Sequence, residues 1–409
     1  FTVTDAAGSE TFELTMLEDQ AVVVQDRYWV RCLPADFPGI TVKTNPAVGA
    51  PTPGWYLVGN GKVAATSGGY AMVLDVHGTP VWYERAGVVL GVDSFAKNTL
   101  SFMPNATSPF GTSTAAAYEV HDLVAGTVTK LTAVGQATDG HELRMLPNGN
   151  HLVLAYPLTT GVDLTGLSIF GANSTMADCE IQEVDPSNAL VWSWRASDHV
   201  DPMTESKEPT SYAVGAQTVV DVFHCNAIDV DSGGNLLLSM RHTNSVFYID
   251  RSTGKILWKL GGTATNKDGA TPIVVQNDPE GTFSMQHDAR FLANGHVSLF
   301  DDHGAGFLGE VARGVEYSID HTTDTATVAW QFLGSATSTF MGSTRRGDDG
   351  DTVIGWGGLT VGTTMLTEVN STGAAVLDMS FGSGDASYRA VKVPLTQLDH
   401  DVLRRAAAQ

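Results

Sequence analysis

Three histidines occupy related positions in the sequence, each a short distance before a turn glycine. His141 and His287 lie eight residues before the glycine of an Asn-Gly pair, and His224 lies ten residues before that of a Gly-Gly pair. Arg241 follows the Gly-Gly pair by seven residues. Imidazole can act as a nucleophile or as a general acid or base near neutral pH, and a guanidinium fork matches sulfate, phosphate or carboxylate oxygens. If these four side chains converge, they predict a site that acts on an anion.

The turn glycines also indicate which residues neighbour the histidines. In an antiparallel hairpin the start of the first strand lies beside the end of the second. The expected pairs are His141 with Tyr156, His224 with Arg241, and His287 with Asp302. Asp302 could then hold one ring nitrogen of His287 and aim the other. In a fourth copy the equivalent position is Gly357, beside Trp356, which is expected to line the same site.

Four hairpins supply these positions, and a larger repeat surrounds them. They span residues 141–156, 224–241, 287–302 and 344–357, each with Asn-Gly, Gly-Gly or Asp-Gly where a two-residue turn needs positive φ. A second kind of hairpin recurs and closes on Trp82, Leu131, Trp194, Trp258, Trp330 and Met379. Six four-stranded units predict an all-β fold, a six-bladed β-propeller with a small N-terminal β appendage, and two packed sandwiches are the alternative.

The chain divides into three parts on this pattern. Residues 1–46 form an N-terminal β-strand region, residues 47–394 form the propeller, and residues 395–409 form a C-terminal tail in which a short helix is expected. The stretches 157–180, 196–221 and 261–284 are polar and glycine-rich, so we expect loops over one rim. The tryptophans that close the outer strands are expected in the core between blades.

The composition indicates a well-packed chain without affinity for nucleic acid. Of the 409 residues 43% are hydrophobic, and the net charge is −22 from 45 acidic and 23 basic side chains. Binding to nucleic acid requires a basic stripe, and the sequence has none. No window approaches the roughly 20 apolar residues of a membrane span. The expected partners are therefore small molecules, and the acidity favours solubility in an exposed or salty environment.

A metal site is the main rival explanation for the histidine cluster, because neutral imidazole binds zinc readily. Arg241 argues against it, since a fixed cation beside a metal ion is costly, so we expect neither a metal nor another cofactor. A single histidine on a strand is more often structural, and His242, which follows a strand end, receives no role. Cys32, Cys179 and Cys225 lack metal-ligand spacing and allow at most one disulfide.

The motifs around these residues resemble those of the bacterial arylsulfate sulfotransferase family. The resemblance rests on three segments, DGHELRMLPNGN, VFHCNAIDVDSGGNLLLSMRHTNSVFYIDRSTGKILWKLGG and MQHDARFLANGHVSLFDD, in the family's order. It implies a six-bladed propeller with a small N-terminal β domain that moves a sulfuryl group from an aryl sulfate to a phenol. It also implies transient sulfation of His287, with His141, His224, Asn226 and Arg241 as the other site residues.

The residue types are consistent with that chemistry. A neutral imidazole can approach the three oxygens of a sulfuryl group, while Arg241 and Asn226 can stabilise the charge on those oxygens. A protonated His141 or His224 can give a proton to the departing phenolate. Two half-reactions through one covalent enzyme predict ping-pong kinetics. The sequence lacks the glycine-rich phosphate-binding loop, so a nucleotide sulfate donor is not expected.

Two other functions would also use an anion pocket on a propeller. A polysaccharide lyase acting on uronate-containing glycans would use Arg241 to neutralise the carboxylate, with Tyr156 and a histidine moving the protons. A non-catalytic propeller would only bind an anionic ligand. The family resemblance further implies a secreted or periplasmic protein. Because the chain begins at Phe1 rather than Met, removal of a leader is expected.

Overall fold

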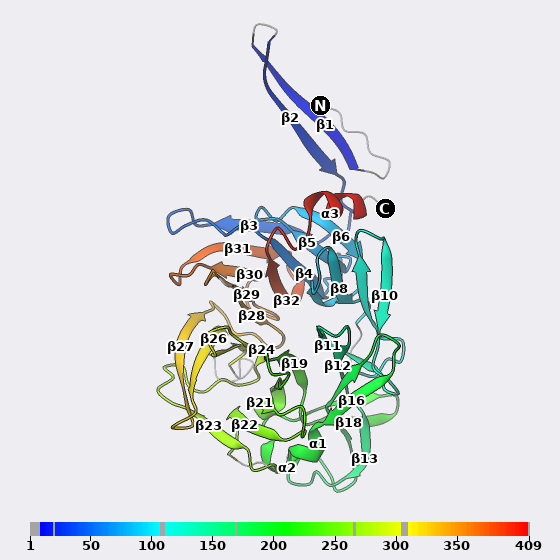
Figure 1. Ribbon diagram of the computed structural model, residues 1–409, viewed down its shortest axis with the longest axis vertical. Helices are drawn as coiled ribbons and strands as arrows, with labels where there is room; N and C mark the ends of the chain where they lie inside the picture. The colour runs from blue at the N-terminus through cyan, green and yellow to red at the C-terminus, as the bar shows by residue number, and fades with distance from the viewer. Residues whose placement is uncertain are drawn as a thin grey trace.

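Strands dominate the chain, which confirms the expectation of an all-β fold. The computed structural model describes residues 9–18, 21–106, 111–167, 170–264, 267–303, 310–347 and 349–407. It is 47% strand and 5% helix (Figure 1). The apolar and β-branched runs beside the turn glycines are buried along their whole length, as in β12 (His151–Ala155) and β20 (Leu236–Met240), which favours strands covered on both faces.

Six antiparallel runs of four strands recur within the sheets, and the strand given first in each is here called its first strand. One is β32 (Ala386–Val393), β4 (Trp55–Lys62), β5 (Tyr70–Leu74) and β6 (Pro80–Arg85). The next is β7 (Leu90–Asp93), β8 (Thr99–Met103), β9 (Tyr118–Asp122) and β10 (Thr127–Leu131). The third is β11 (Thr138–Met145), β12, β15 (Glu180–Val184) and β16 (Leu190–Arg195).

The second half of the chain continues the pattern. The fourth run is β19 (Cys225–Val230), β20, β21 (Ser245–Ile249) and β22 (Ile256–Gly261). The fifth is β24 (His287–Phe291), β25 (Val297–Asp301), β26 (Arg313–Asp320) and β27 (Thr325–Leu333). The sixth is β28 (Ser343–Arg346), β29 (Thr352–Gly355), β30 (Thr364–Val369) and β31 (Ala375–Phe381), and β3 (Ile40–Thr44) pairs with the edge of β31.

The first strands of the six runs contact one another in a closed cycle. β32 contacts β7, β7 contacts β11, β11 contacts β19, β19 contacts β24, β24 contacts β28, and β28 contacts β32. The cycle closes through β32, which comes from the C-terminal end of the chain and pairs with β4 near the beginning. Side chains from six distant segments therefore meet around one centre.

The four predicted hairpins are confirmed as β11–β12, β19–β20, β24–β25 and β28–β29. The prediction that the three polar stretches are loops is wrong. They contain β13 (Leu158–Val162), β14 (Ser174–Ala177), α1 (Ala196–His199), α2 (Pro202–Glu205), β17 (Thr210–Val214), β18 (Gln217–Asp221) and β23 (Thr271–Val275). β13, β14, β18 and β17 form a separate sheet. Because β13 and β17 expose most of their side chains, no buried apolar run marks them in the sequence.

Hydrophobic clusters hold neighbouring sheets together, and Trp82, Trp194 and Trp258 are buried in them as predicted. A disulfide joins Cys179, between β14 and β15, to Cys225 at the start of β19. It fastens the separate sheet to the fourth run beside the centre of the cycle.

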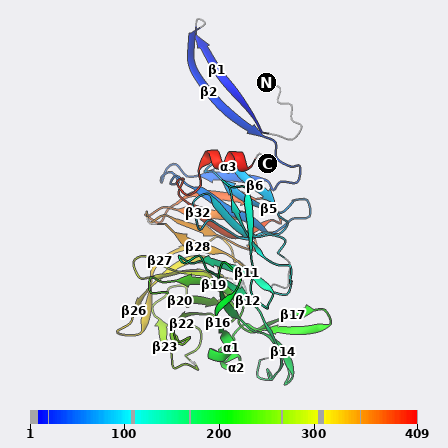
Figure 2. The same cartoon turned by 45° about the vertical axis from the view of Figure 1, so that its right-hand side comes forward.

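The described elements nearest the two ends of the chain, a hairpin and a helix, lie on the same side of the body (Figure 1). β1 (Ser9–Glu18) and β2 (Ala21–Arg31) form a hairpin that extends away from the other sheets (Figure 2). α3 (His400–Ala406) lies in the C-terminal tail, where Asp399 caps its first turn by accepting from the Asp401 and Val402 amides. Among the described residues, no helix has the length and apolar character that a membrane span requires.

Candidate active site

Five of the six first strands break their regular pairing at the centre of the cycle. Register shifts fall between Leu90 and Asp93 in β7, Thr138 and Leu143 in β11, Cys225 and Ala227 in β19, His287 and Arg290 in β24, and Ser387 and Ala390 in β32. A β-bulge turns the side chains around it in new directions. His224, just before β19, and Asp288, in β24, also have left-handed backbones, with φ of 51° and 57°. Strained backbone therefore occurs where the candidate site residues lie.

One cavity of about 510 Å³ lies at this centre, and four predicted residues line it together. They are His141 from β11, His224 before β19, Arg241 after β20 and His287 at the start of β24. The structure therefore brings all four side chains of the predicted anion site into one volume. Apolar wall is supplied by Val63, Val88, Ala106, Phe340 and Met341. A cavity with polar groups on one side and apolar groups on the other suits an anion attached to a hydrophobic or aromatic group.

Each of the three histidines is bonded through Nδ1 to a carboxylate. The pairs are His141 with Asp139 at 2.7 Å, His224 with Asp221 at 2.6 Å, and His287 with Asp302 at 2.7 Å. A carboxylate on Nδ1 fixes the ring orientation and makes Nε2 the nitrogen that faces away from it. The contact between His287 and Asp302 is the one expected from the hairpin alignment.

Burial controls the protonation of His287. It lowers the pKa of the imidazole well below its usual value, and the nearby Arg241 and the other cavity histidines lower it further. Burial also raises the pKa of the Asp302 carboxyl, while the Arg241 charge opposes that rise. His287 is therefore neutral near pH 7. With the shared proton on Nδ1, its Nε2 carries a lone pair that can attack an electrophile.

Arg241 differs from the other buried arginines in having no acidic partner. Its Nη1 donates to His242 Nε2 at 3.0 Å, and its Nη2 donates to the Thr339 carbonyl at 3.1 Å and contacts Met285 Sδ at 3.3 Å. Within the described residues, no carboxylate forms an ion pair with this guanidinium, although the side chain is only 8% exposed. The cavity lining also includes Lys62 and, among the described residues, no carboxylate, so this buried positive charge strongly favours binding of an anion.

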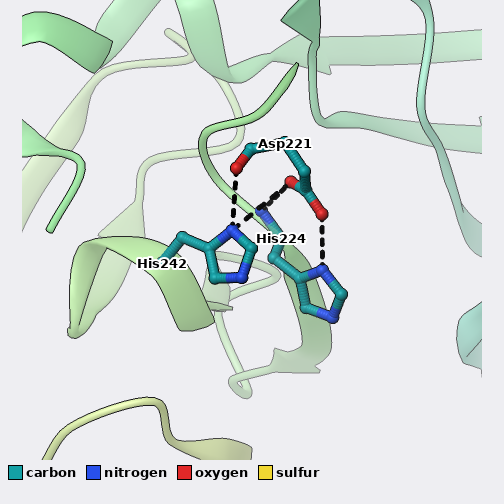
Figure 3. Close-up of side chains that lie close together, drawn as sticks. All are labelled: Asp221, His224 and His242. Atoms are coloured by element: carbon teal, nitrogen blue, oxygen red, sulfur yellow. Dashed lines mark hydrogen bonds and ion pairs between the residues drawn. The ribbon is translucent and has the colours of Figure 1, made fainter. Parts of the chain in front are cut away.

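His242 bonds to Arg241 and to Asp221, and Asp221 in turn bonds to His224 (Figure 3). Its Nδ1 donates to the Asp221 backbone carbonyl at 2.9 Å, while the Asp221 carboxylate holds His224. His224 and His242 lie with ring centroids 4.7 Å apart. His242 was assigned no role from the sequence because it follows a strand end, yet the short 3-10 turn after β20 directs its side chain back into the cavity.

Asp221, His224 and His242 are also residue types that bind transition metals. One ligand atom from each lies within 4.8 Å of the others. The network described above already uses Nδ1 of His224 and both nitrogens of His242, one of which is bonded to the guanidinium of Arg241. A metal ion would be repelled by that charge at short range. A second such group, Glu84, Glu119 and His121, lies between β6 and β9, away from the cavity lining.

Replacing His242 with glutamine is expected to weaken the pH dependence of stability in acid. Burial, outweighing the attraction of Asp221, lowers the pKa of His242 from 6.5 to about 3. As pH falls below 6.5, the unfolded chain takes up a proton here that the folded chain does not, so stability present above 6.5 is lost. That loss is about 1.4 kcal/mol for each pH unit. Urea unfolding of both proteins at about one and two pH units below 6.5 measures it, because the unfolded histidine is then almost fully protonated. An equal loss in the two proteins contradicts the assignment.

Asn226, Tyr156 and Trp356 were also expected at the site, and none of them lines the cavity. Asn226 is fully buried behind the cavity wall, where its amide donates to the Gln286 carbonyl at 2.7 Å. The Tyr156 hydroxyl donates to the Cys225 carbonyl and lies 3.4 Å from His141 Nδ1, which is the neighbour relation expected from the hairpin.

Trp356 does not reach the cavity. It packs against Phe300 and Phe332 in a hydrophobic cluster, and its indole N–H donates to the Thr367 hydroxyl at 2.8 Å. The alignment placed it at the mouth because it adjoins Gly357, but the left-handed backbone of Gly357, with φ of 60°, turns the strand end away from a regular extension. We therefore assign Trp356 to the core.

Several site residues were missed from the sequence, and some left a signal. Asp139 and Asp221 precede their histidines by two and three residues, so an Asp-x-His or Asp-x-x-His pattern marks them. Tyr388 left none, because β32 brings it from the far end of the chain. Its hydroxyl donates to the His141 carbonyl at 3.0 Å and lies 3.3 Å from the Asn226 carbonyl.

A buried charge network lies directly behind the site. Glu142 and Asp288 each follow a cavity histidine, and both bond to Arg290 and Arg389. Arg345 adds two bonds of 2.7 Å to Asp288. Because these residues come from β11, β24, β28 and β32, the network fastens the first strands to one another behind the histidines. Its cost in desolvation is repaid only while every charge keeps its partners.

A family model described as Arylsulfotransferase (ASST) matches residues 44–389, which include every residue that lines the cavity. No curated protein matches the chain. Among solved structures, the chain is similar to a protein of unknown function from Bacteroides caccae, with 13% identity and a TM-score of 0.48 over 84% of this chain and 99% of that one. It is also similar to a virginiamycin B lyase from Staphylococcus aureus, with 9% identity and a TM-score of 0.39 over 90% and 87%. Likenesses at these scores carry no argument about function.

Proposed function

Because the chain belongs to the arylsulfotransferase family, we propose that it transfers a sulfuryl group from an aryl sulfate to a phenol through sulfated His287. The observation that carries this proposal is the unpaired charge of Arg241 beside a neutral, carboxylate-oriented His287 in one cavity. A sulfate ester supplies the missing negative charge, and its aryl group suits the apolar wall.

The closed cycle of first strands supports the finer architecture. We infer that the six four-stranded runs are the blades of a six-bladed β-propeller whose axis passes through the cavity. In such a ring the first strands are innermost, which accounts for the convergence of residues from four different runs. The β1–β2 hairpin then corresponds to the small N-terminal β appendage.

In the first half-reaction the Nε2 lone pair of His287 forms a bond to sulfur, and the bond from sulfur to the aryl oxygen breaks. The electron pair of that bond leaves with the phenolate, which takes a proton from His141 or His224. In the second half-reaction the acceptor phenol gives its proton to the same histidine. Its oxygen then bonds to sulfur, and the S–N bond breaks to restore His287. Arg241 stabilises the sulfuryl oxygens in both steps.

Asn226 has a different place in this scheme from the one expected. Its amide is committed to the Gln286 carbonyl, so it holds the backbone immediately before His287 rather than contacting the sulfuryl group. Burial, aided by His141 and Arg241, lowers the pKa of His224. A lowered pKa makes the protonated ring a stronger acid toward the departing phenolate, and the neutral ring that remains can then take the proton of the acceptor phenol.

The proposal is tested with 4-nitrophenyl sulfate and a phenol acceptor. We expect release of nitrophenol, ping-pong kinetics and, without acceptor, a peptide containing His287 that gains the mass of one SO₃ group. Absence of both nitrophenol and the adduct contradicts the proposal. A uronate lyase would instead yield an unsaturated sugar that absorbs in the ultraviolet, and a binding protein would yield no product. The lyase loses support because the Tyr156 hydroxyl is bonded to a backbone carbonyl.

Replacing Asp302 with asparagine is expected to lower kcat/KM about 10³-fold. The carboxamide can donate to Nδ1, which moves the ring proton to Nε2 and removes the attacking lone pair. In the wild type the rate should rise with pH as the buried Asp302 ionises, because burial raises the pKa of that carboxyl. The variant should lose this limb of the pH–rate profile. A variant that keeps both the rate and the limb shows that Asp302 does not orient His287.

We also propose that the protein is secreted or periplasmic. The bond between Cys179 and Cys225 supports this, since disulfides persist mainly in oxidising compartments. Fractionation of cells that express the full-length gene tests it. Recovery of the protein in the cytosol with both thiols reduced contradicts the assignment.

A further inference from the structure

Two hydrogen bonds fix the role of the His242 ring. Its Nδ1 lies 2.9 Å from the Asp221 backbone carbonyl, which can only accept, so Nδ1 carries the proton. Its Nε2 is then a lone-pair acceptor, and it lies 3.0 Å from Nη1 of Arg241. The side chain is 1% exposed, so water does not compete for either nitrogen.

We propose that His242 is the positioning residue for Arg241, a neutral acceptor that holds the guanidinium toward the cavity and so sets the affinity of the site for sulfate esters and sulfonates. The inference rests on the proposed function only for the identity of the anion. It is independent of whether the anion is transferred to His287.

The other contacts of Arg241 are too few to position it. Nη2 has a backbone carbonyl and a thioether sulfur, which is a weak acceptor, and Nε is buried without a partner among the described residues. An acidic residue in place of His242 would hold the guanidinium as well, but it would also cancel its charge. A neutral nitrogen acceptor fixes the direction of the fork and leaves the full positive charge for the ligand.

The ring itself is held firmly enough for this task. It packs against His224 and is tied to Asp221, while the turn that carries it ends at Asn244, whose left-handed backbone has a φ of 51°. Burial keeps the pKa of His242 near 3, so the ring stays an acceptor throughout the physiological range. The bond to Arg241 therefore does not switch with pH.

The test compares His242→Gln with His242→Leu, using 4-nitrobenzenesulfonate as a probe that binds like a sulfate ester but has no bond to transfer. Glutamine can donate to the Asp221 carbonyl and accept from Arg241, whereas leucine of similar volume can do neither. Calorimetry should show about tenfold or greater loss of affinity for the leucine variant, the usual effect of removing a hydrogen bond to a charged group. The glutamine variant should stay within about threefold of wild type.

Kinetics with 4-nitrophenyl sulfate gives a second readout. The leucine variant should show a raised KM together with a lowered kcat, because the displaced fork serves both the bound ester and the transition state. Thermal melting confirms that each variant is folded before binding is measured. Wild-type affinity in the leucine variant, or equal losses in both variants, overturns the proposal. If the probe binds as expected but wild type forms no sulfated peptide, the positioning role stands and the proposed transfer fails.

Discussion

Replacing His287 with alanine is expected to abolish the sulfated peptide and to lower kcat/KM for 4-nitrophenyl sulfate by about 10⁴-fold or more. In the proposed mechanism the nucleophile is the one group in the site that forms a covalent bond, so no neighbour is expected to substitute for it. The rings of His141 and His224 are each held by a carboxylate of their own, Asp139 and Asp221, so neither is free to take the position of His287. Mass spectrometry of the protein after brief exposure to the donor measures the adduct directly.

The matched control is His296→Ala, on the same β24–β25 hairpin. His296 bonds to Glu316 outside the cavity, so its loss should leave turnover within about twofold of wild type. Free imidazole added to His287→Ala should restore some release of nitrophenol by accepting the sulfuryl group in the vacated space. A sulfated peptide that persists in His287→Ala would move the nucleophile to another histidine.

Replacing Arg241 with methionine is expected to lower kcat/KM by about 10³-fold and to abolish measurable binding of 4-nitrobenzenesulfonate. The change removes the charge that the cavity leaves uncompensated, while the unbranched side chain keeps most of the volume. Lysine at the same position restores the charge but not the planar fork, so we expect intermediate activity. Steady-state kinetics and calorimetry on the same preparations separate the loss of binding from the loss of rate.

Arg346→Gln is the matched control for a change of charge. Arg346, at the end of β28, pairs with Glu316 of β26 and does not line the cavity. Its loss should therefore leave donor binding unchanged. Removing the buried charge of Arg241 should also raise the melting temperature slightly, because an unpaired cation in the interior opposes folding. Equal binding by Arg241→Met and wild type would refute the anion site.

The hairpins and most of the site were predictable because a turn glycine imposes a local rule. A turn of fixed length determines which residues lie opposite, so Asp302 could be paired with His287 from spacing alone. The expected two-residue turn was wrong, because the turns at Gly149, Gly234 and Gly295 each have three residues, of which only the glycine has positive φ. The convergence of His141, His224 and Arg241 followed from applying the same rule to each repeat. The bulges in the strands that carry these residues were not predictable, because no residue near His224 in the sequence indicates that it adopts a left-handed backbone. That conformation is imposed by packing around the centre.

The remaining differences have the same origin in tertiary structure. His242 was expected outside the site because it follows the end of β20, but a short turn directs its side chain into the cavity. Trp356 was expected to line the site because it follows the end of β29, yet it packs into the core. The outer strands β13 and β17 were expected as loops because exposed strands carry no apolar alternation. Sequence patterns therefore predict least well the side-chain directions at strand ends and the presence of exposed strands.

The arrangement of β32 has a consequence for how this protein is made. The strand begins at residue 386 of 409, yet it supplies Tyr388 and Arg389 to a site whose other members were synthesised long before. A ribosome that stalls or terminates anywhere before this strand releases a polypeptide in which the cycle of first strands is not closed. The site of that polypeptide also lacks Tyr388 and Arg389. Stop codons placed shortly before residue 386 should therefore give inactive product, so turnover reports that translation passed β32.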